Sequence, residues 1–364
     1  MIAAVCHEFG GPLELEEVEL RPPEAAEVSV RVSACAVCHS DIAYMSGAWG
    51  GDLPAVYGHE CAGVVEVVGA GVDVLKQGDH VVVTLVRSCG RCGPCRWEQP
   101  TLCEGGFISD TSPPLRTRQG GPLLQAMHTA AFAELVTVDA SQAIVVPSEL
   151  PLDRACLLAC GVLTGLGAVV NTAQVRPGSS VVVVGTGGVG LNCVQGARLA
   201  GAAVIVALDL SDDKLAAAKL FGATDVLNPS LTDAREQVEE LTDGHGADYV
   251  LVATGSSVAS ALGFGLLRRG GTLVIVGIPP SGTVLSLDPV AIADGSLRIL
   301  GSKMGASQPR LDIPRAAQSY LTGELMLDEL ISSRFALAEI NEAVSSAKRG
   351  EQLRPVIVFP GAVV

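Results

Sequence analysis

The alternation of hydrophobic and polar positions divides the chain into three regions with different sequence patterns. Residues 1 to about 160 carry short apolar runs separated by Gly, Pro and Asp. Runs of this length between turn residues predict short strands, so we expect this region to be mostly β. The Pro-Pro and Gly-Gly pairs of residues 105–121 predict its longest loop. Its clearest predicted strands are 28–37, 62–72 and 79–86.

Residues from about 162 to 303 alternate strand-like and helix-like segments. The run 180–184 is apolar throughout and opens into a glycine-rich turn. Such a strand needs cover on both faces, and the alternation predicts parallel βαβ units in a doubly wound sheet. The predicted strands are 180–184, 204–208, 225–227, 249–253 and 272–276, and the predicted helices are 191–200, 212–221, 234–241 and 258–267.

The third region, from about 304 to 364, is short and ends in an apolar run. Because the βαβ region is complete without it, we assign it to the first domain. The predicted domains are therefore 1–161 with 304–364, mostly β, and 162–303, an α/β domain. The predicted elements of the third region are helices over 313–322 and 340–348 and a strand over 354–359.

Composition restricts the class of protein. The chain has 364 residues, of which 48% are hydrophobic and 17% charged, which excludes an intrinsically disordered protein. A net charge of −15 disfavours nucleic acid and anionic membranes as partners. The uncharged runs 155–175 and 177–197 reach membrane-spanning length, but their Gly, Asn and Gln residues favour a buried core instead. The first residues lack the basic segment of a signal peptide, so we expect a cytoplasmic protein.

The string VVVVGTGGVG carries Gly185, Gly187 and Gly190 in a GxGxxG pattern that follows an apolar strand. In this context the glycines permit a tight turn, close approach of a pyrophosphate and close helix packing. Asp209 ends the next predicted strand. A carboxylate at this place accepts hydrogen bonds from ribose hydroxyls and repels a 2′-phosphate. The pattern therefore predicts NAD rather than NADP, with Lys214 also within reach of the ribose. A turn without ligand and an FAD site show the same pattern and stay open at this point.

Four cysteines lie close together in the sequence CGRCGPC…C. Four thiolates around one ion make a closed tetrahedral zinc site, which is structural rather than catalytic. Disulfides and an iron–sulfur cluster are the alternatives. The cysteines are Cys89, Cys92, Cys95 and Cys103.

Three further segments hold dispersed ligand candidates: Cys38 in CHSD, His59 in GHE and Cys160 in ACG. One such set leaves a fourth zinc position for water or substrate, which is the catalytic pattern. Spacing alone does not bring these residues together, because a single buried Cys is usually a small hydrophobic residue.

At these residues the chain resembles the zinc-dependent medium-chain alcohol dehydrogenase family, especially its liver-type and class III-like long-chain members. The resemblance rests on CHSD, GHE, the four-cysteine segment, CGVLTG at 160–165, GTGGVG, Asp209 and the terminal LRPVIVF, in family order. It implies a GroES-like catalytic domain and a Rossmann cofactor domain, with NAD and two zinc ions per chain, one catalytic and one structural. It also implies a homo-oligomer, for which the long loop after Cys103 favours a dimer over a tetramer.

The resemblance implies roles for individual residues. Cys38, His59 and Cys160 would hold the catalytic zinc, with Glu60 as an occasional alternative ligand and Asp41 orienting His59. Other implied roles are the alcohol proton acceptor Ser40, the nicotinamide-side Thr164, the pyrophosphate contact Arg354, and the cofactor-binding Gly188, Val276 and Ile278.

One position departs from the family pattern. Where several liver-type members carry a proton-relay His, this chain has Ala43, so the proton must leave by another route, through ribose hydroxyls and His39. His39 stands where family members place Arg or His against the cofactor phosphate. A His holds pyrophosphate less firmly than an Arg, so we expect faster cofactor release.

Substrate clues are few. Trp49 aligns with a pocket-wall position of the family, where an indole narrows the pocket or stacks on an aromatic alcohol, and Leu85 is a second candidate for the wall. We therefore expect a hydrophobic or aromatic primary alcohol and its aldehyde. The alternatives are a class III-like S-(hydroxymethyl)thiol or formaldehyde dehydrogenase, which needs basic pocket residues, and a catalytically silent NAD-binding scaffold.

Overall fold

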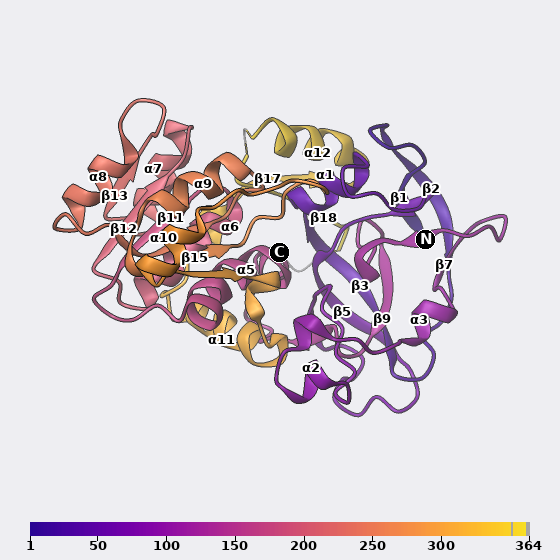
Figure 1. Cartoon of the computed structure of the whole chain (residues 1–364). Coiled ribbons are helices and arrows are strands. Elements are labelled where there is room, and N and C mark those ends of the chain that lie inside the picture. The colour runs from indigo at the N-terminus through magenta and orange to yellow at the C-terminus, as the bar shows by residue number, and fades with distance from the viewer. Residues whose placement is uncertain (351, 362–364) are drawn as a thin grey trace. The chain divides into compact units, whose positions relative to one another are not determined.

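The computed structural model describes residues 1–350 and 352–361, and the chain divides into two compact units (Figure 1). Unit 1 comprises Met1–Gly161 and Gln308–Val364, and unit 2 comprises Val162–Ser307. The chain thus re-enters unit 1 at Gln308, whereas the sequence pattern predicts that the second segment of this domain starts at residue 304. The Ser307 hydroxyl donates to the carbonyl of Leu163 (3.3 Å), which ties the preceding turn to unit 2.

Unit 1 is mostly β. One sheet has the strand order β7-β2-β1-β4-β8, and the other has β10-β6-β5-β3-β18-β17, with β9 also paired to β3. The central strand β3 is buried along nearly its whole length, because β5, β9 and β18 all pair with it. The strands are β1 (Ile2–Cys6), β2 (Leu13–Leu20), β3 (Glu27–Ala36), β4 (Ala55–Val56), β5 (Glu60–Val68), β6 (His80–Val83), β7 (Leu115–Thr117), β8 (Leu124–Gln125), β9 (Leu135–Asp139), β10 (Ala143–Val145), β17 (Ile331–Ala336) and β18 (Arg354–Val358).

Short helices connect and cover these strands. The amphipathic α12 places Ile340, Ala343 and Ala347 in the core, and it ends at Arg349, followed by Gly350, whose φ of +71° is costly for other residues. The helix predicted to start at residue 313 begins at Pro309, since proline suits the first turn. The helices of unit 1 are α1 (His39–Met45), α2 (Gly93–Arg96), α3 (Ile108–Thr111), α4 (Leu152–Ala155), α11 (Pro309–Leu321) and α12 (Ile340–Arg349), with 3₁₀ turns η1 (Pro100–Leu102), η2 (Ala126–His128), η3 (Cys156–Ala159), η6 (Asp328–Leu330) and η7 (Leu337–Glu339).

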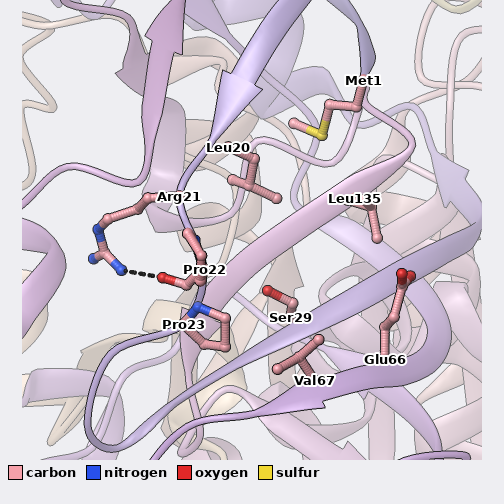
Figure 2. Close-up of a pocket in the computed structure, with 9 residues that line it drawn as sticks. All are labelled: Met1, Leu20, Arg21, Pro22, Pro23, Ser29, Glu66, Val67 and Leu135. Atoms are coloured by element: carbon pink, nitrogen blue, oxygen red, sulfur yellow. Dashed lines mark hydrogen bonds between the residues drawn. The ribbon is translucent and has the colours of Figure 1, made fainter.

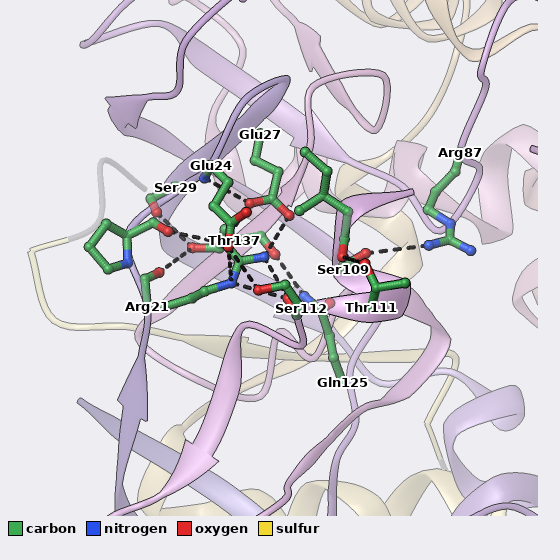
Figure 3. A network of polar contacts seen from close by, with 12 residues as sticks. Arg21, Glu24, Glu27, Ser29, Arg87, Ser109, Thr111, Ser112, Gln125 and Thr137 are labelled. Atoms are coloured by element: carbon green, nitrogen blue, oxygen red, sulfur yellow. Dashed lines mark hydrogen bonds and ion pairs between the residues drawn. The ribbon is translucent and has the colours of Figure 1, made fainter. Parts of the chain in front are cut away.

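The predicted loop 105–121 is not a plain loop, because it contains both α3 and β7. Figure 3 shows the polar network that fixes it. Arg21 forms two hydrogen bonds with Glu27 (2.6 and 2.9 Å) and also donates to the Ser112 carbonyl (2.7 Å). A second contact holds the same segment, because Arg87 donates a hydrogen bond to Asp110 (2.6 Å). Long-range partners of this kind leave no trace in the local pattern.

Unit 2 is a six-stranded parallel sheet of order β13-β12-β11-β14-β15-β16 with helices between the strands. The predicted doubly wound fold is confirmed, and three strands have the predicted bounds. The sequence pattern misses the edge strand β16, which is mostly exposed and has no apolar run, and it starts β15 too late. The elements are α5 (Gly161–Gly167), the π-helical η4 (Ala168–Ala173), β11 (Ser180–Val184), α6 (Gly188–Leu199), β12 (Val204–Leu208), α7 (Asp212–Leu220), β13 (Asp225–Leu227), α8 (Ala234–Leu241), β14 (Ala247–Val252), α9 (Ser257–Gly265), β15 (Leu267–Ile275), α10 (Pro289–Gly295), β16 (Arg298–Gly301) and η5 (Lys303–Ala306).

Among residues 1–350 and 352–361, no single helix is long and apolar enough to cross a membrane. One bent pair, Leu152–Ala159 with Gly161–Ala173, meets the criteria of length and composition together.

Candidate metal centres and glycine-rich turn

Strand pairing brings the dispersed cysteine and histidine residues of unit 1 together. In the antiparallel ladder of β3 and β5, Ala36 lies opposite Glu60, so the chain leaving β3 toward Cys38 meets the chain entering β5 at His59. Cys160 joins them after η3. The ligand atoms of Cys38, His59, Glu60 and Cys160 all lie within 4.8 Å of one another, and all four residues are buried. We call these four residues the buried cluster.

Asp41 holds two segments of the buried cluster in place. This fully buried carboxylate accepts the backbone N–H of Cys38 (3.2 Å) and that of Gly58 (2.9 Å). Its Oδ1 lies 3.0 Å from Nδ1 of His59. The Nε2 atom of His59 is buried and has no hydrogen-bond partner among the described residues. Metal-ligating histidines show this arrangement: one ring nitrogen is hydrogen-bonded to a carboxylate, and the other has no protein partner and is left for the metal.

Electrostatics makes the buried cluster suited to a cation. Burial lowers the pKa of His59, but the charges of Asp41 and Cys38 outweigh it and raise that pKa to about 10. A hydrogen bond with Cys160 lowers the pKa of Cys38 well below its usual range, against the opposing effect of burial. The pocket therefore favours a thiolate and a positive charge close to it.

Arg354 lies against the buried cluster. Its Nη2 forms an ion pair with Oε2 of Glu60, and both side chains are almost completely buried. A Cβ atom at Gly161 would lie 3.4 Å from the guanidinium carbon of Arg354, so the arginine packs over the residue that follows Cys160. The other oxygen of Glu60, Oε1, has no partner among the described residues. The resemblance implies a pyrophosphate contact for Arg354, and that role stays a prediction.

The four neighbouring cysteines, Cys89, Cys92, Cys95 and Cys103, form a second group with ligand atoms within 4.8 Å of one another. We call their segment, residues 88–105, the cysteine lobe. Backbone N–H groups point at its sulfurs: that of Cys89 at Sγ of Cys103 (3.3 Å) and that of Cys92 at Sγ of Cys89 (3.4 Å). All the chain's cysteines are free thiols in the structure, so no disulfide closes this lobe.

The thiols of the cysteine lobe differ in acidity. Hydrogen bonds from the backbone at Arg91 and Cys92 lower the pKa of Cys89 to about 6, while burial raises that of Cys103 to about 12. Four sulfurs this close repel one another as thiolates, so a cation is needed for all of them to ionise together.

The predicted glycine turn lies between β11 and α6 in unit 2. Gly185 has a φ of +89°, which suits glycine, and a Cβ at Gly190 would lie 1.8 Å from the carbonyl oxygen of Gly185. A Cβ at Gly187 would meet nothing within 4 Å, so the backbone there is open to a ligand. Gly188 begins α6, whose first N–H groups have no partner within the helix. This open turn fits a dinucleotide pyrophosphate.

Asp209 lies beside this turn at the end of β12, half-buried. Its Oδ2 accepts the backbone N–H (2.8 Å) and the hydroxyl (3.2 Å) of Thr186, and its Oδ1 accepts the N–H of Ser211 (3.0 Å). The partly exposed Lys214 follows in the first turn of α7, and its N–H donates to the Ser211 hydroxyl (3.5 Å). Thr186 is a residue that the sequence analysis missed, although a hydroxyl between two motif glycines was a visible signal.

The remaining predicted residues of unit 1 are His39, Ser40, Trp49 and Leu85. His39 is exposed and Ser40 is half-buried, both in the first turn of α1. Trp49 packs edge-on against Tyr44, with ring centroids 5.1 Å apart. Leu85 is half-buried and follows Thr84, whose hydroxyl donates to the carbonyl of Ala159 (2.7 Å). That bond holds the Leu85 segment close to Cys160.

In unit 2, the buried Thr164 donates its hydroxyl to the sulfur of Met304 (3.7 Å). Val276 is buried just after β15, whereas Ile278 is exposed. The structure therefore brings Asp209 and the glycine turn together, and it leaves Ile278 free of the core.

Two other features of unit 1 lie outside these groups. His7, Glu14 and Glu16 also cluster, but they are exposed or partly exposed. Leu20, Ser29 and Leu135 are among the residues that line a pocket of about 270 Å³. Figure 2 shows the residues around this pocket. No predicted site residue lines it.

Known proteins match over nearly the whole chain. The protein-family model described as "alcohol dehydrogenase GroES-like domain" matches residues 24–148. The family model described as "zinc-binding dehydrogenase" matches residues 188–320. Alcohol dehydrogenase 1 of Trifolium repens is 35% identical, over 98% of this chain and 96% of that protein. Alcohol dehydrogenase class-3 of Cereibacter sphaeroides is also 35% identical, over 98% and 99%. This chain belongs to the zinc-dependent medium-chain alcohol dehydrogenase family.

The structural comparison agrees with that assignment. Benzyl alcohol dehydrogenase from Acinetobacter calcoaceticus superposes with a TM-score of 0.93 at 32% identity, covering 98% of this chain and 99% of the other. The predicted family and the predicted GroES-like and Rossmann folds are therefore confirmed. This alcohol dehydrogenase is an oxidoreductase of small-molecule alcohols or aldehydes that uses zinc and a nicotinamide cofactor.

Proposed function

We propose that this alcohol dehydrogenase interconverts a hydrophobic primary alcohol and its aldehyde with NAD, at a catalytic zinc held by Cys38, His59 and Cys160. The observation that carries the proposal is the buried Nε2 of His59, which has no partner among the described residues and lies in a group whose ligand atoms are within 4.8 Å. Two sulfurs and one imidazole suit zinc, and three protein ligands leave one position open. A zinc ion held there supplies the Lewis acidity that lowers the pKa of an alcohol.

Glu60 is the alternative ligand of this proposal. Its Oε2 is engaged by Arg354, while its buried Oε1 has no partner among the described residues. The arginine thus neutralises the carboxylate and holds it beside the three proposed ligands. This arrangement supports a carboxylate that stands next to the metal rather than permanently on it.

Two residues of α1 are the candidates for taking up the proton of the alcohol. Ser40 offers a half-buried hydroxyl, and the neighbouring His39 is exposed to solvent. With Ala43 at the position of the family's relay His, we propose that Ser40 accepts the proton and that His39 and the ribose hydroxyls pass it to water.

The cofactor proposed for unit 2 is NAD rather than NADP. The carboxylate of Asp209 repels a 2′-phosphate and accepts hydrogen bonds from ribose hydroxyls. Gly187 has the open backbone that a pyrophosphate requires, and Thr164, Lys214, Val276 and Ile278 are further proposed contacts.

We propose a second, structural zinc in the cysteine lobe. Its four sulfurs leave no open position, and backbone N–H groups already stabilise negative charge on two of them. The lobe buries few side chains of its own, so the ion would supply stability that packing does not.

For the substrate, Trp49 and Leu85 support an apolar pocket wall, and the relative named for benzyl alcohol supports an aromatic primary alcohol. The second candidate is an S-(hydroxymethyl)thiol, which the relative named class-3 favours. Such a substrate carries carboxylates and needs basic residues in its pocket, which neither Trp49 nor Leu85 supplies.

A homodimer in the cytoplasm completes the proposal. The edge strand β16 pairs only with β15 among the described strands; it carries the exposed Ile299, and the exposed Val284 and Val290 precede it in the chain. An open edge with apolar neighbours favours association. Sedimentation at micromolar concentration distinguishes the dimer from a monomer or a tetramer.

The central test measures metal content and activity on the same preparation. We expect two zinc ions per chain and NAD reduction with benzyl alcohol, with much weaker reduction of NADP. A faster reaction with S-(hydroxymethyl)glutathione would favour the class III-like candidate. Activity that survives complete removal of zinc, or no activity with any alcohol or aldehyde, would overturn the proposal.

A further inference from the structure

The carboxylate of Asp209 is held on both oxygens before any cofactor contact is considered. Oδ1 accepts the N–H of Ser211, at the N-cap of α7. Oδ2 accepts both the N–H and the hydroxyl of Thr186, in the glycine turn. A carboxylate offers about four acceptor sites, so these three bonds leave roughly one of them free and fix the plane of the group.

The hydroxyl is the part of this arrangement that depends on the side chain. Every residue except proline offers a backbone N–H at position 186, but the second donor to the same oxygen is the side-chain hydroxyl of Thr186. The Thr186 side chain is fully buried, so its hydroxyl is shielded from solvent. A hydrogen bond to a charged group in such a place orients that group strongly.

We propose that Thr186 is a positioning residue that orients Asp209 toward the ribose hydroxyls and so contributes to the preference for NADH over NADPH. This inference rests on the proposed cofactor site. Without the hydroxyl, Asp209 keeps its charge and continues to repel a 2′-phosphate, but its free acceptor site is less well aligned with the ribose. Thr186 therefore acts on NADH affinity and hardly at all on NADPH affinity.

The test compares T186V with T186S, using NADH fluorescence to measure dissociation constants. Valine keeps the branched shape without the hydroxyl, and serine keeps the hydroxyl. From the loss of one bond to a charged group, we expect T186V to raise the NADH dissociation constant about five- to tenfold. NADPH affinity should change less than about twofold, and T186S should bind NADH about as the parent does. Thermal unfolding of each variant checks that the fold is intact.

A double-mutant cycle with Asp209→Ala separates this inference from the proposed function. In the D209A background the T186V substitution should have no further effect on NADH binding. Equal weakening by T186V and T186S, no weakening by T186V, or the same weakening with and without Asp209 would each overturn the role of Thr186. If D209A alone leaves both NADH and NADPH affinities unchanged, the proposed cofactor site itself is wrong.

Discussion

The cysteine lobe and the buried cluster assemble metal-ligating side chains in opposite ways. The lobe takes its four sulfurs from one short segment, half-exposed, with its own backbone N–H groups as partners. The buried cluster takes Cys38, His59 and Cys160 from three distant segments, and a fully buried Asp41 holds the first two of them through the backbone of Cys38 and the ring of His59.

This difference separates what each site needs in order to form. The buried cluster stands at the end of the β3–β5 ladder, so the folded sheet positions it whether or not a metal is present. The cysteine lobe has few buried side chains, and its closely spaced thiolates repel one another without a cation. We therefore expect metal loss to abolish chemistry at the first site and to reduce stability at the second.

The largest expected effect is the loss of activity in Cys38→Ser. Replacing a soft thiolate by a hydroxyl removes a proposed zinc ligand, and we expect kcat to fall at least about a thousandfold, or about 4 kcal/mol of activation free energy. Zinc analysis should show one ion per chain instead of two. Thermal unfolding should shift little, because Asp41 and the strand ladder remain. A variant that keeps two zinc ions and most of its activity would mean that Cys38 is not a ligand.

Cys95→Ser is the matched change in the cysteine lobe. Loss of a structural metal belongs to the mutations that cost about 4 kcal/mol of unfolding free energy or more. We expect a much lower unfolding temperature, while kcat measured on folded protein in the cold stays within about threefold of the parent. If Cys95→Ser abolished activity without changing stability, the contrast between the two sites would be wrong.

The same contrast explains what the sequence could predict. The cysteine lobe and the glycine turn are local, so their spacing alone indicates their chemistry. The buried cluster depends on the register that places Ala36 opposite Glu60, and no local pattern contains that register. Residue types alone make Cys38, His59 and Cys160 candidates, and only the resemblance to a family favoured them as one set.

The fold was predictable to a similar degree. Apolar runs such as Ser180–Val184 predict their strands with the correct bounds. The segment 105–121 was predicted wrongly, because the partners of Arg21 and Arg87 that order it lie far away in the sequence. The hydroxyl contact of Thr186 with Asp209 likewise depends on two strands being neighbours.

Asp41→Asn tests whether the orientation of His59 affects zinc binding when the proposed zinc ligands themselves are unchanged. The amide keeps the shape but not the charge that faces His59, and changes behind a ligating histidine cost about 10- to 100-fold in metal affinity or activity. Competition with a chromogenic chelator measures the affinity of the buried cluster. Asp73→Asn, at an exposed loop position, is the control and should leave it unchanged. Equal zinc affinity in D41N and the parent would contradict the proposed role of Asp41.

A smaller effect is expected at His39, the exposed neighbour of the buried Cys38. An Arg holds pyrophosphate more firmly than a His, so His39→Arg should lower the NADH dissociation constant about threefold. Ser46→Arg adds the same charge at the exposed far end of α1 and serves as the control. Unchanged NADH affinity in H39R would rule out a phosphate contact at this position.

The smallest expected effect concerns the ion pair of Asp110 with Arg87, which helps to fix the segment 105–121. Burial raises the pKa of this carboxyl, but hydrogen bonds from Arg87 and from the N–H of Phe107 outweigh it and hold the pKa below its usual range. A group whose pKa is depressed by folding stabilises the protein above its unfolded pKa and loses that contribution as pH falls through the folded value. Because the Asp110 side chain is 38% exposed, screening limits the contribution to about 0.5 kcal/mol. Asp110→Asn should therefore unfold slightly more easily than the parent at pH 7, and the difference should narrow as the pH falls below about 4. Chemical denaturation at both pH values measures it, and a difference that grows in acid would show that the Arg87 ion pair does not stabilise this segment.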